Sequence, residues 1–153
     1  MKSLNRDIAA ELHPVYGAAS TAVTAGAGSD GTAVNGASLA LADLPTRFES
    51  VAFALAAAAT LAEDKTLTVA AKIQTSADGG STWDDIRDSE TVITLTGGTG
   101  GTSETGAAII GVSLEYAAAL VRVVFTPTMS ATATDTAVIQ TTALFGGAAR
   151  NPA

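Results

Sequence analysis

The strongest constraint on the fold is an alternating run of residues that leads directly into a glycine-bearing turn. Over residues 66–75, larger apolar side chains alternate with more polar ones, the apolar set being Leu67, Val69, Ala71 and Ile73. A period of two places that set on one face of a β-strand. Residues 76–83 then read Ser-Ala-Asp-Gly-Gly-Ser-Thr-Trp. Glycines supply positive φ and an Asp carboxylate accepts hydrogen bonds from turn amides, so the pattern predicts a β-hairpin with Trp83 across its base.

The turn also resembles a known hairpin motif. Its residues fit the pattern Ser-x-Asp-x-Gly-x-Thr-Trp, at Ser76, Asp78, Gly80, Thr82 and Trp83. This resembles the Asp-box, best known from the propeller blades of sialidases and found in other β-proteins. The resemblance implies a structural hairpin, since the Asp-box shapes its turn and does no chemistry. A single copy does not build a multi-blade propeller, so a sialidase is not expected.

Further strands are expected on both sides of the hairpin. Residues 47–58 fit a helix as well as a strand because alanine is so frequent, and a strand is favoured because the neighbouring segments are clearly β. Pro127 is expected to end one strand. No repeat of useful period is visible, which argues against a solenoid or propeller. The pattern predicts an all-β protein with one β-sandwich or jelly-roll-like domain, with strands at residues 37–42, 47–58, 67–75, 83–87, 90–95, 107–114, 120–126 and 137–145.

Both ends of the chain are expected to lie outside this domain. Residues 1–35 are predicted to form an N-terminal arm, with a short amphipathic helix over residues 3–12 and then an extended segment rich in Gly, Ala and Thr. Within that segment one edge strand is expected near residues 21–24. Residues 36–146 form the predicted sandwich, and residues 147–153 a short tail.

Composition limits the partners. A formal net charge of −7 argues against nucleic acid, because phosphate binding needs clustered Lys and Arg. Charged residues make up only 15% of the chain and hydrophobic ones 47%, which predicts a weakly charged surface and contacts between subunits. The most apolar run, residues 51–61, is too short to span a membrane. With no signal peptide evident and no cysteine to report a redox compartment, we expect a soluble protein made in the cytoplasm.

Candidate catalytic and ligand-binding groups are few. The only histidine, His13, has no acidic or hydroxyl partner nearby in sequence. The glycine-rich loop at residues 96–102 lacks the Gly-Lys-Ser/Thr ending of a phosphate cradle. An acidic cluster formed by Asp78, Asp84, Asp85 and Asp88 is open to three interpretations: a calcium site, paired carboxylates for glycoside hydrolysis, or a solvated acidic rim. Its spacing follows no known calcium loop. We therefore expect no enzymatic activity, no cofactor and no metal.

Three segments together resemble small virion proteins of tailed bacteriophages that are assigned to capsid decoration. The first is the start of the chain, Met-Lys-Ser-Leu, followed by an apolar stretch rich in Gly and Thr. The second is the strand-turn-strand at residues 69–86, which resembles the family's "sxDGsTW" hairpin. The third joins Tyr116 and the Leu-Val-Arg-Val-Val-Phe strand at residues 120–125 to a small-residue ending at residues 145–153. The likeness spans most of the chain, which departs from the family pattern by a longer glycine-rich loop and an alanine-heavy second strand.

The resemblance implies a capsid decoration, or cement, protein on the outer surface of a phage head. Its expected partner is the major capsid protein, its expected state a homotrimer and its location the virion, after synthesis in the host cytoplasm. Candidate contact residues are Leu4, Ile8, Tyr16 and Arg150. Two other classes stay open: a glycan-binding or host-contact module, which would need exposed aromatic side chains, and a head-tail connector or tail component.

Overall fold

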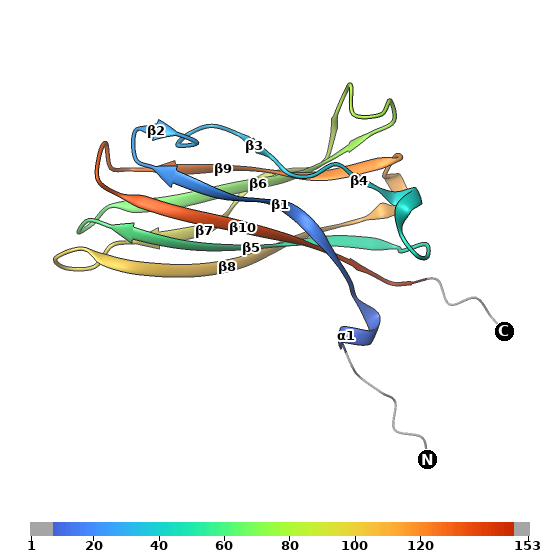
Figure 1. Ribbon diagram of the computed structural model, residues 1–153, viewed down its shortest axis with the longest axis horizontal. Helices are drawn as coiled ribbons and strands as arrows, with labels where there is room; N and C mark the ends of the chain where they lie inside the picture. Colours follow the sequence, from blue (N-terminus) through green and yellow to red (C-terminus); the bar gives the residue numbers. More distant parts are fainter. Residues whose placement is uncertain (1–7, 149–153) are drawn as a thin grey trace, which may run out of the picture.

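A computed structural model describes residues 8–148 and shows two antiparallel sheets packed face to face (Figure 1). The first sheet has the strand order β2-β1-β10-β5-β8 and the second β3-β9-β6-β7, with β4 also paired to β9. The strands are β1 (His13–Thr24), β2 (Ala27–Gly28), β3 (Val34–Asn35), β4 (Leu39–Ala40), β5 (Ser50–Leu61), β6 (Thr66–Ser76), β7 (Asp84–Thr96), β8 (Thr102–Ser113), β9 (Leu120–Met129) and β10 (Thr136–Gly146). Short helices are α1 (Ile8–Glu11), η1 (Leu41–Asp43) and η2 (Leu114–Tyr116).

The strand order identifies the type of sandwich. The first long strand, β1, lies beside the last, β10, and β5 and β8 complete the first sheet. From β5 onward the chain changes sheet at each strand except between β6 and β7, which are consecutive in the second sheet with β9 on the other side of β6. With β3 and β4 taken as one interrupted strand beside β9, this is the eight-strand arrangement of a jelly roll. The expected all-β sandwich is therefore confirmed.

The alternation of β5 shows why this alanine-rich segment is a strand. Val51, Phe53 and Leu55 point inward and are at most 1% exposed, while the intervening alanines point outward. In a helix the same apolar residues would point in different directions, whereas a strand buries all of them against the second sheet. The two sheets enclose the core, whose largest fully buried side chains are Phe53, Phe125, Phe145, Leu55, Leu61, Leu67, Ile73, Ile110 and Ile139.

The N-terminal segment differs from the sequence-based expectation. The helix predicted over residues 3–12 is present only as α1, residues 3–7 lying outside the described residues. Much of the expected arm is instead the twelve-residue strand β1, which pairs with β10 from His13 opposite Phe145 to Thr24 opposite Thr136. The composition of this segment predicted an arm because the segment has few large apolar residues. The hydrogen bonds offered by β10 and the burial of Val23 outweigh that preference.

Gly17 makes this pairing possible. It lies where the register between β1 and β10 shifts, and a Cβ there would come within 3.0 Å of both the Ala143 nitrogen and the Thr141 oxygen. Only glycine allows the two backbones to approach so closely.

Three strand boundaries also differ from expectation. The two strands predicted at residues 83–87 and 90–95 form the single strand β7, because register shifts against β6 absorb the irregular region between them. Residues 37–42 contain only the two-residue β4 and part of η1. Pro127 does not end β9, which continues to Met129. It lies beyond the residues of β9 that pair with β3 and β4, and the Gly31 N–H donates to its carbonyl at 2.8 Å. No described strand pairs on that side, so the N–H that proline lacks is not needed there. Within residues 8–148, no helix has the length and apolar character needed to cross a membrane.

Candidate interaction surfaces

The predicted hairpin turn connects β6 to β7 and projects beyond the sheets at the end of the sandwich where α1 lies (Figure 1). Asp78 organises it. The Thr82 backbone N–H donates to Asp78 Oδ1 at 2.8 Å and the Thr82 hydroxyl donates to Oδ2 at 2.7 Å. Ser76 Oγ also donates to Oδ1, at 2.8 Å, and accepts from the Gly80 N–H at 2.9 Å. Gly79 and Gly80 both have positive φ, as the sequence predicted.

These hydrogen bonds fix the charge state of Asp78. The backbone N–H of Thr82, its hydroxyl and the Ser76 hydroxyl lower the pKa of Asp78 from 3.8 to about 2. Each bond favours the ionised carboxylate, which accepts hydrogen bonds at both oxygens. Both carboxylate oxygens of Asp78 thus accept hydrogen bonds from residues of the turn itself.

Trp83 lies against the same turn. Its indole Nε1–H donates to the Gly80 carbonyl at 3.0 Å, and the Arg122 guanidinium lies 4.0 Å from the ring centroid. This is a cation–π contact, with the cation covering one face of the ring. Trp83 is therefore partly enclosed by its own protein.

Arg122 also anchors a polar chain across three strands, β9, β6 and β7. Gln74 Oε1 accepts from Arg122 Nε at 3.0 Å and from Nη2 at 2.8 Å, while Gln74 Nε2 donates to Asp85 Oδ1 at 2.6 Å. Lys72 Nζ completes the chain with an ion pair to Asp85 Oδ2 at 3.0 Å. The Gln74 and Lys72 contacts lower the pKa of Asp85, and burial lowers the pKa of Arg122. The outer face of the second sheet thus carries charged side chains, and Lys72, Asp85 and Arg122 are held there by hydrogen bonds.

The acidic cluster expected near this turn does not converge. Asp78 is held within the turn and Asp85 by Gln74 and Lys72, while Asp84 and Asp88 are exposed on β7. Across residues 8–148, no three His, Cys, Asp or Glu side chains are grouped closely enough to hold a metal ion. His13 stacks on Phe48, with ring centroids 5.7 Å apart.

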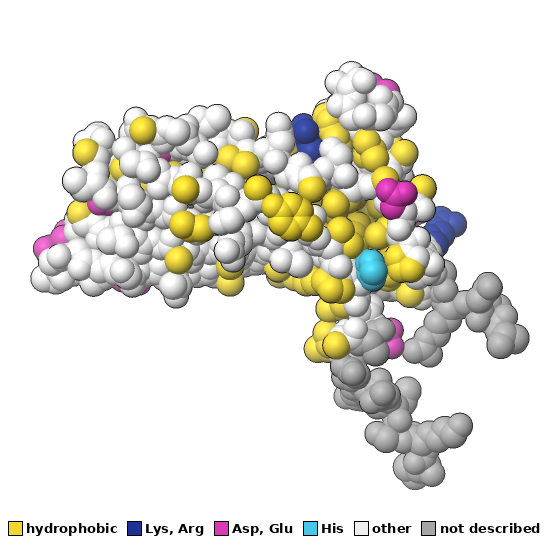
Figure 2. Space-filling model, viewed as in Figure 1, with side chains coloured by type: hydrophobic (Ala, Val, Ile, Leu, Met, Phe, Trp, Pro, Cys, Tyr) yellow, Lys and Arg dark blue, Asp and Glu magenta, His cyan; other side chains and the backbone are white. Residues whose placement is uncertain are grey.

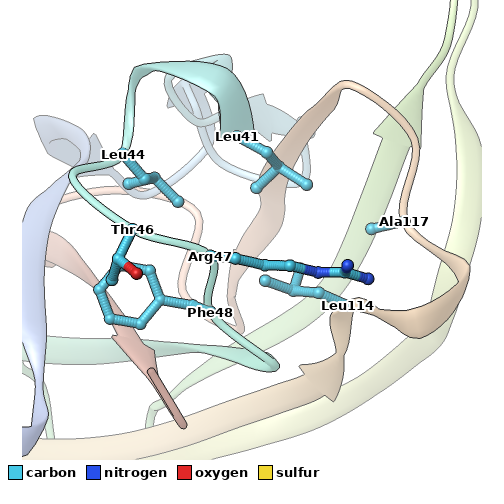
Figure 3. A pocket seen from close by; sticks show the side chains of 7 residues that line it. All are labelled: Leu41, Leu44, Thr46, Arg47, Phe48, Leu114 and Ala117. Carbon is cyan, nitrogen blue, oxygen red and sulfur yellow. The ribbon is translucent and has the colours of Figure 1, made fainter. Parts of the chain in front are cut away.

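An open hollow of about 430 Å³ lies at this end of the sandwich (Figure 3). Leu41, Leu44, Phe48 and Leu114 supply apolar walls, and Arg47 extends across the hollow with its guanidinium on the side of Leu114. The residues that line the hollow are mostly apolar, with Arg47 as the one charged group among them. A catalytic site needs several polar groups that converge on a substrate, so this lining is better suited to contact with an apolar side chain.

The outer face of the first sheet is different in kind, and we name it the uncharged face: the outward-facing residues of β1, β10, β5 and β8. None of these described residues is charged, and most are small. Figure 2 shows the side on which β1 and β10 lie, where white and yellow side chains fill the middle and charged ones lie toward the ends and the upper edge. The outward residues are Pro14, Tyr16, Ala22, Thr24, Ser50, Ala52, Ala54, Ala56, Ala58, Thr60, Ser103, Thr105, Ala107, Ile109, Gly111, Ser113, Thr136, Val138, Gln140, Thr142 and Leu144.

The four contact residues predicted from the sequence fall in different places. Leu4 and Arg150 lie outside the described residues. Ile8 is 72% exposed on α1, and Tyr16 is 65% exposed on the uncharged face. Tyr16 therefore belongs to the outer face of a sheet and not to the extended N-terminal arm that the sequence predicted.

Sequence reasoning missed two members of that surface. Ile109 is 63% exposed and Val138 is 42% exposed, both on the uncharged face. A signal for Ile109 was present, because it is followed directly by Ile110, and two adjacent residues of a strand point to opposite faces.

Comparison with known proteins finds similarity in fold but not in sequence. No family model matches the chain, and no curated protein matches it. A solved structure of infectious bursal disease virus, Gx strain, matches 92% of this chain with a TM-score of 0.52 and 11% identity. A crystal structure of the T13 viral particle of infectious bursal disease virus matches 90% of it with a TM-score of 0.50 and 8% identity. The match covers 33% and 31% of those chains, so this chain spans about a third of their length. At these identities the likeness establishes a shared sandwich fold.

Proposed function

We propose that the chain is a structural virion protein, a capsid decoration protein that binds the outer surface of a tailed-phage head and stabilises the lattice of the major capsid protein. The observation that carries this proposal is the jelly-roll order of the two sheets. Jelly rolls are a recurrent architecture of viral capsid proteins, and two solved structures that share this fold are those of a virus and of a viral particle. Two polar clusters of the described residues support a structural role. The side chains of the turn at Asp78 hydrogen-bond to groups of that turn, and Gln74 hydrogen-bonds to its neighbours on the sheet.

The contact with the capsid is proposed to involve the two ends of the chain. Because β1 begins at His13, the proposed N-terminal contact segment is residues 1–12 rather than residues 1–35. Ile8, 72% exposed on α1, offers an apolar anchor. The α1 helix and the end of β10 lie at the same end of the sandwich (Figure 1), so residues 1–12 and 147–153 start from neighbouring points. The net charge of −7 would complement a basic patch on the lattice protein.

Co-sedimentation with purified capsids of the encoding virus tests this proposal. The wild-type protein is expected to pellet with capsids in a fixed ratio. Deletion of residues 1–12 leaves the whole of β1 in place, so the variant should unfold cooperatively as before but stay in the supernatant. An Ile8→Ser variant should bind more weakly, and Tyr116→Ser, which removes an equally exposed apolar side chain from η2, is the matched control. Wild-type protein that never pellets with capsids would refute the decoration role, and full binding by the deletion variant would refute the role of residues 1–12.

A glycan-binding module is the second candidate, because lectins also use the jelly roll and two tyrosines are exposed. Tyr116 is 79% exposed and Tyr16 is 65% exposed. They lie on different surfaces, however, η2 at one end and β1 on the uncharged face, and Arg122 covers one face of Trp83. Sugar platforms present several aromatic rings together, so this arrangement favours the structural role. Retention on a glycan array by protein that ignores capsids would reverse that preference.

A further inference from the structure

We propose that the uncharged face is the surface through which copies of this chain pack against one another. This inference goes beyond decoration, because it concerns the free protein and does not depend on a capsid. In the trimer that the resemblance implies, the face of each copy turns toward the three-fold axis, so that its β1 edge seats on the face of a neighbour.

The relief of the face suits such packing. The strand registers place Tyr16, Thr142, Ala54 and Ile109 in one row across β1, β10, β5 and β8. Tyr16 and Ile109, both more than 60% exposed, stand at the two ends of this row, about 14 Å apart if three strand spacings separate them. Between them the small residues leave a shallow hollow of about 450 Å³. Large side chains at both edges and a low floor between them allow an edge of one copy to seat on the floor of another.

The charge distribution favours a second copy as the occupant. The chain carries a net charge of −7, so two copies repel each other through any acidic surface. The uncharged face places no carboxylate opposite a neighbour's carboxylate. The outer face of the second sheet, in contrast, carries Lys72, Asp85 and Arg122. A basic protein would bind better to an acidic surface of this chain than to the uncharged face, which offers it no opposite charge.

The size of the face matches what a stable assembly needs. Strands of about twelve residues at a rise of about 3.3 Å are about 40 Å long, and four strands spaced by about 4.8 Å are about 19 Å wide. The flat outline of the face is therefore about 750 Å², so a copy seated on it can bury an accessible surface of the order of the roughly 800 Å² per partner of a standard protein–protein interface.

Sedimentation equilibrium on the full chain, without capsids, tests the inference. The wild-type protein is expected to have the mass of three copies of a 15.1 kDa chain, about 45 kDa. Ala56→Glu places a carboxylate at the centre of the face, on an exposed outward position that folding tolerates. An unpaired charge buried between subunits should weaken association at least about 100-fold and give a 15.1 kDa monomer.

Thr94→Glu is the matched control. It adds the same charge at an exposed position of β7 on the outer face of the second sheet, and it should keep the wild-type mass. Circular dichroism and thermal unfolding confirm that both variants are folded. Tyr16→Ser should weaken association to a smaller degree. A dimer that Ala56→Glu dissociates would support the face while removing the three-fold arrangement.

Other outcomes overturn the inference. They are a monomeric wild-type protein at millimolar concentration, an Ala56→Glu variant of unchanged mass, or dissociation by Thr94→Glu as well. If Ala56→Glu kept its mass but no longer pelleted with capsids, the face would bind the lattice protein instead. Failure of capsid binding by a protein that still shows the predicted masses would refute decoration and leave this inference standing.

Discussion

Replacing Gln74 by leucine is expected to lower the free energy of unfolding by about 2 kcal/mol. Gln74 is 8% exposed and lies at the centre of the chain that joins β9, β6 and β7. Its Oε1 accepts two hydrogen bonds from Arg122, at 3.0 and 2.8 Å, and its Nε2 donates to Asp85 Oδ1 at 2.6 Å. Leucine is of similar size and keeps the packing, so the substitution removes mainly the polar contacts.

The magnitude follows from the two charged partners. A hydrogen bond to a charged group contributes about 1.5–3 kcal/mol, so three such bonds set an upper limit well above the expected loss. Asp85, whose side chain is 37% exposed, can exchange its lost partner for water. Arg122 is more desolvated, as its lowered pKa indicates, and two of its donors lose their acceptor. The loss therefore falls mainly on Arg122, and about 2 kcal/mol corresponds to a decrease in Tm of about 4–8 °C for a chain of this size.

Urea denaturation monitored by Trp83 fluorescence and circular dichroism measures the effect. Thr68→Val is the control, since Thr68 points outward on the same strand without a charged partner. A double-mutant cycle with Arg122→Met should give a coupling of about 1 kcal/mol or more. A Gln74→Leu loss no larger than that of Thr68→Val, or a coupling of zero, would refute the reasoning.

Two further predictions concern the turn and the sheet edge. Asp78 should titrate with a pKa of about 2, below its ordinary 3.8, so the hydrogen bonds of the ionised carboxylate stabilise the turn above about pH 4 and are lost as the pH falls toward 2. Carboxyl carbon chemical shifts measured by NMR, with the Thr82 amide as a second probe, check this, and a midpoint near 4 would contradict it. Gly36→Ala should cost about 1–3 kcal/mol in thermal unfolding, because a Cβ there would lie 2.7 Å from the Gly17 oxygen and 2.8 Å from the Val123 oxygen. An unchanged Tm would show that these backbones separate easily.

The sequence predicted the elements whose signal is local. In β6 the alternation of Leu67, Val69, Ala71 and Ile73 is strict, and the turn after it contains every group that its hydrogen bonds use. It failed for β1, where few large apolar residues mark the strand and the hydrogen bonds of β10 decide the outcome. A pairing between residues about 120 positions apart in the chain leaves little trace in either segment alone.

The candidate surface was predictable only in part. Low overall charge indicated contacts between subunits, and Tyr16 was singled out as a contact residue. That Tyr16, Ile109 and Val138 share one face depends on the registers of three strand pairs. The connection of Gln74 to Arg122 and Asp85 is equally non-local, since it needs the order β9-β6-β7.

The central claim is that this protein binds and stabilises a capsid. Its most direct test is to titrate purified wild-type protein onto bare capsids of the encoding virus, measuring the amount bound and the temperature at which the capsids release their genome. The account predicts that binding saturates at a fixed number of copies per capsid and that the release temperature rises with occupancy. Absent or unsaturable binding, or saturated capsids that open at the same temperature as bare ones, would contradict it.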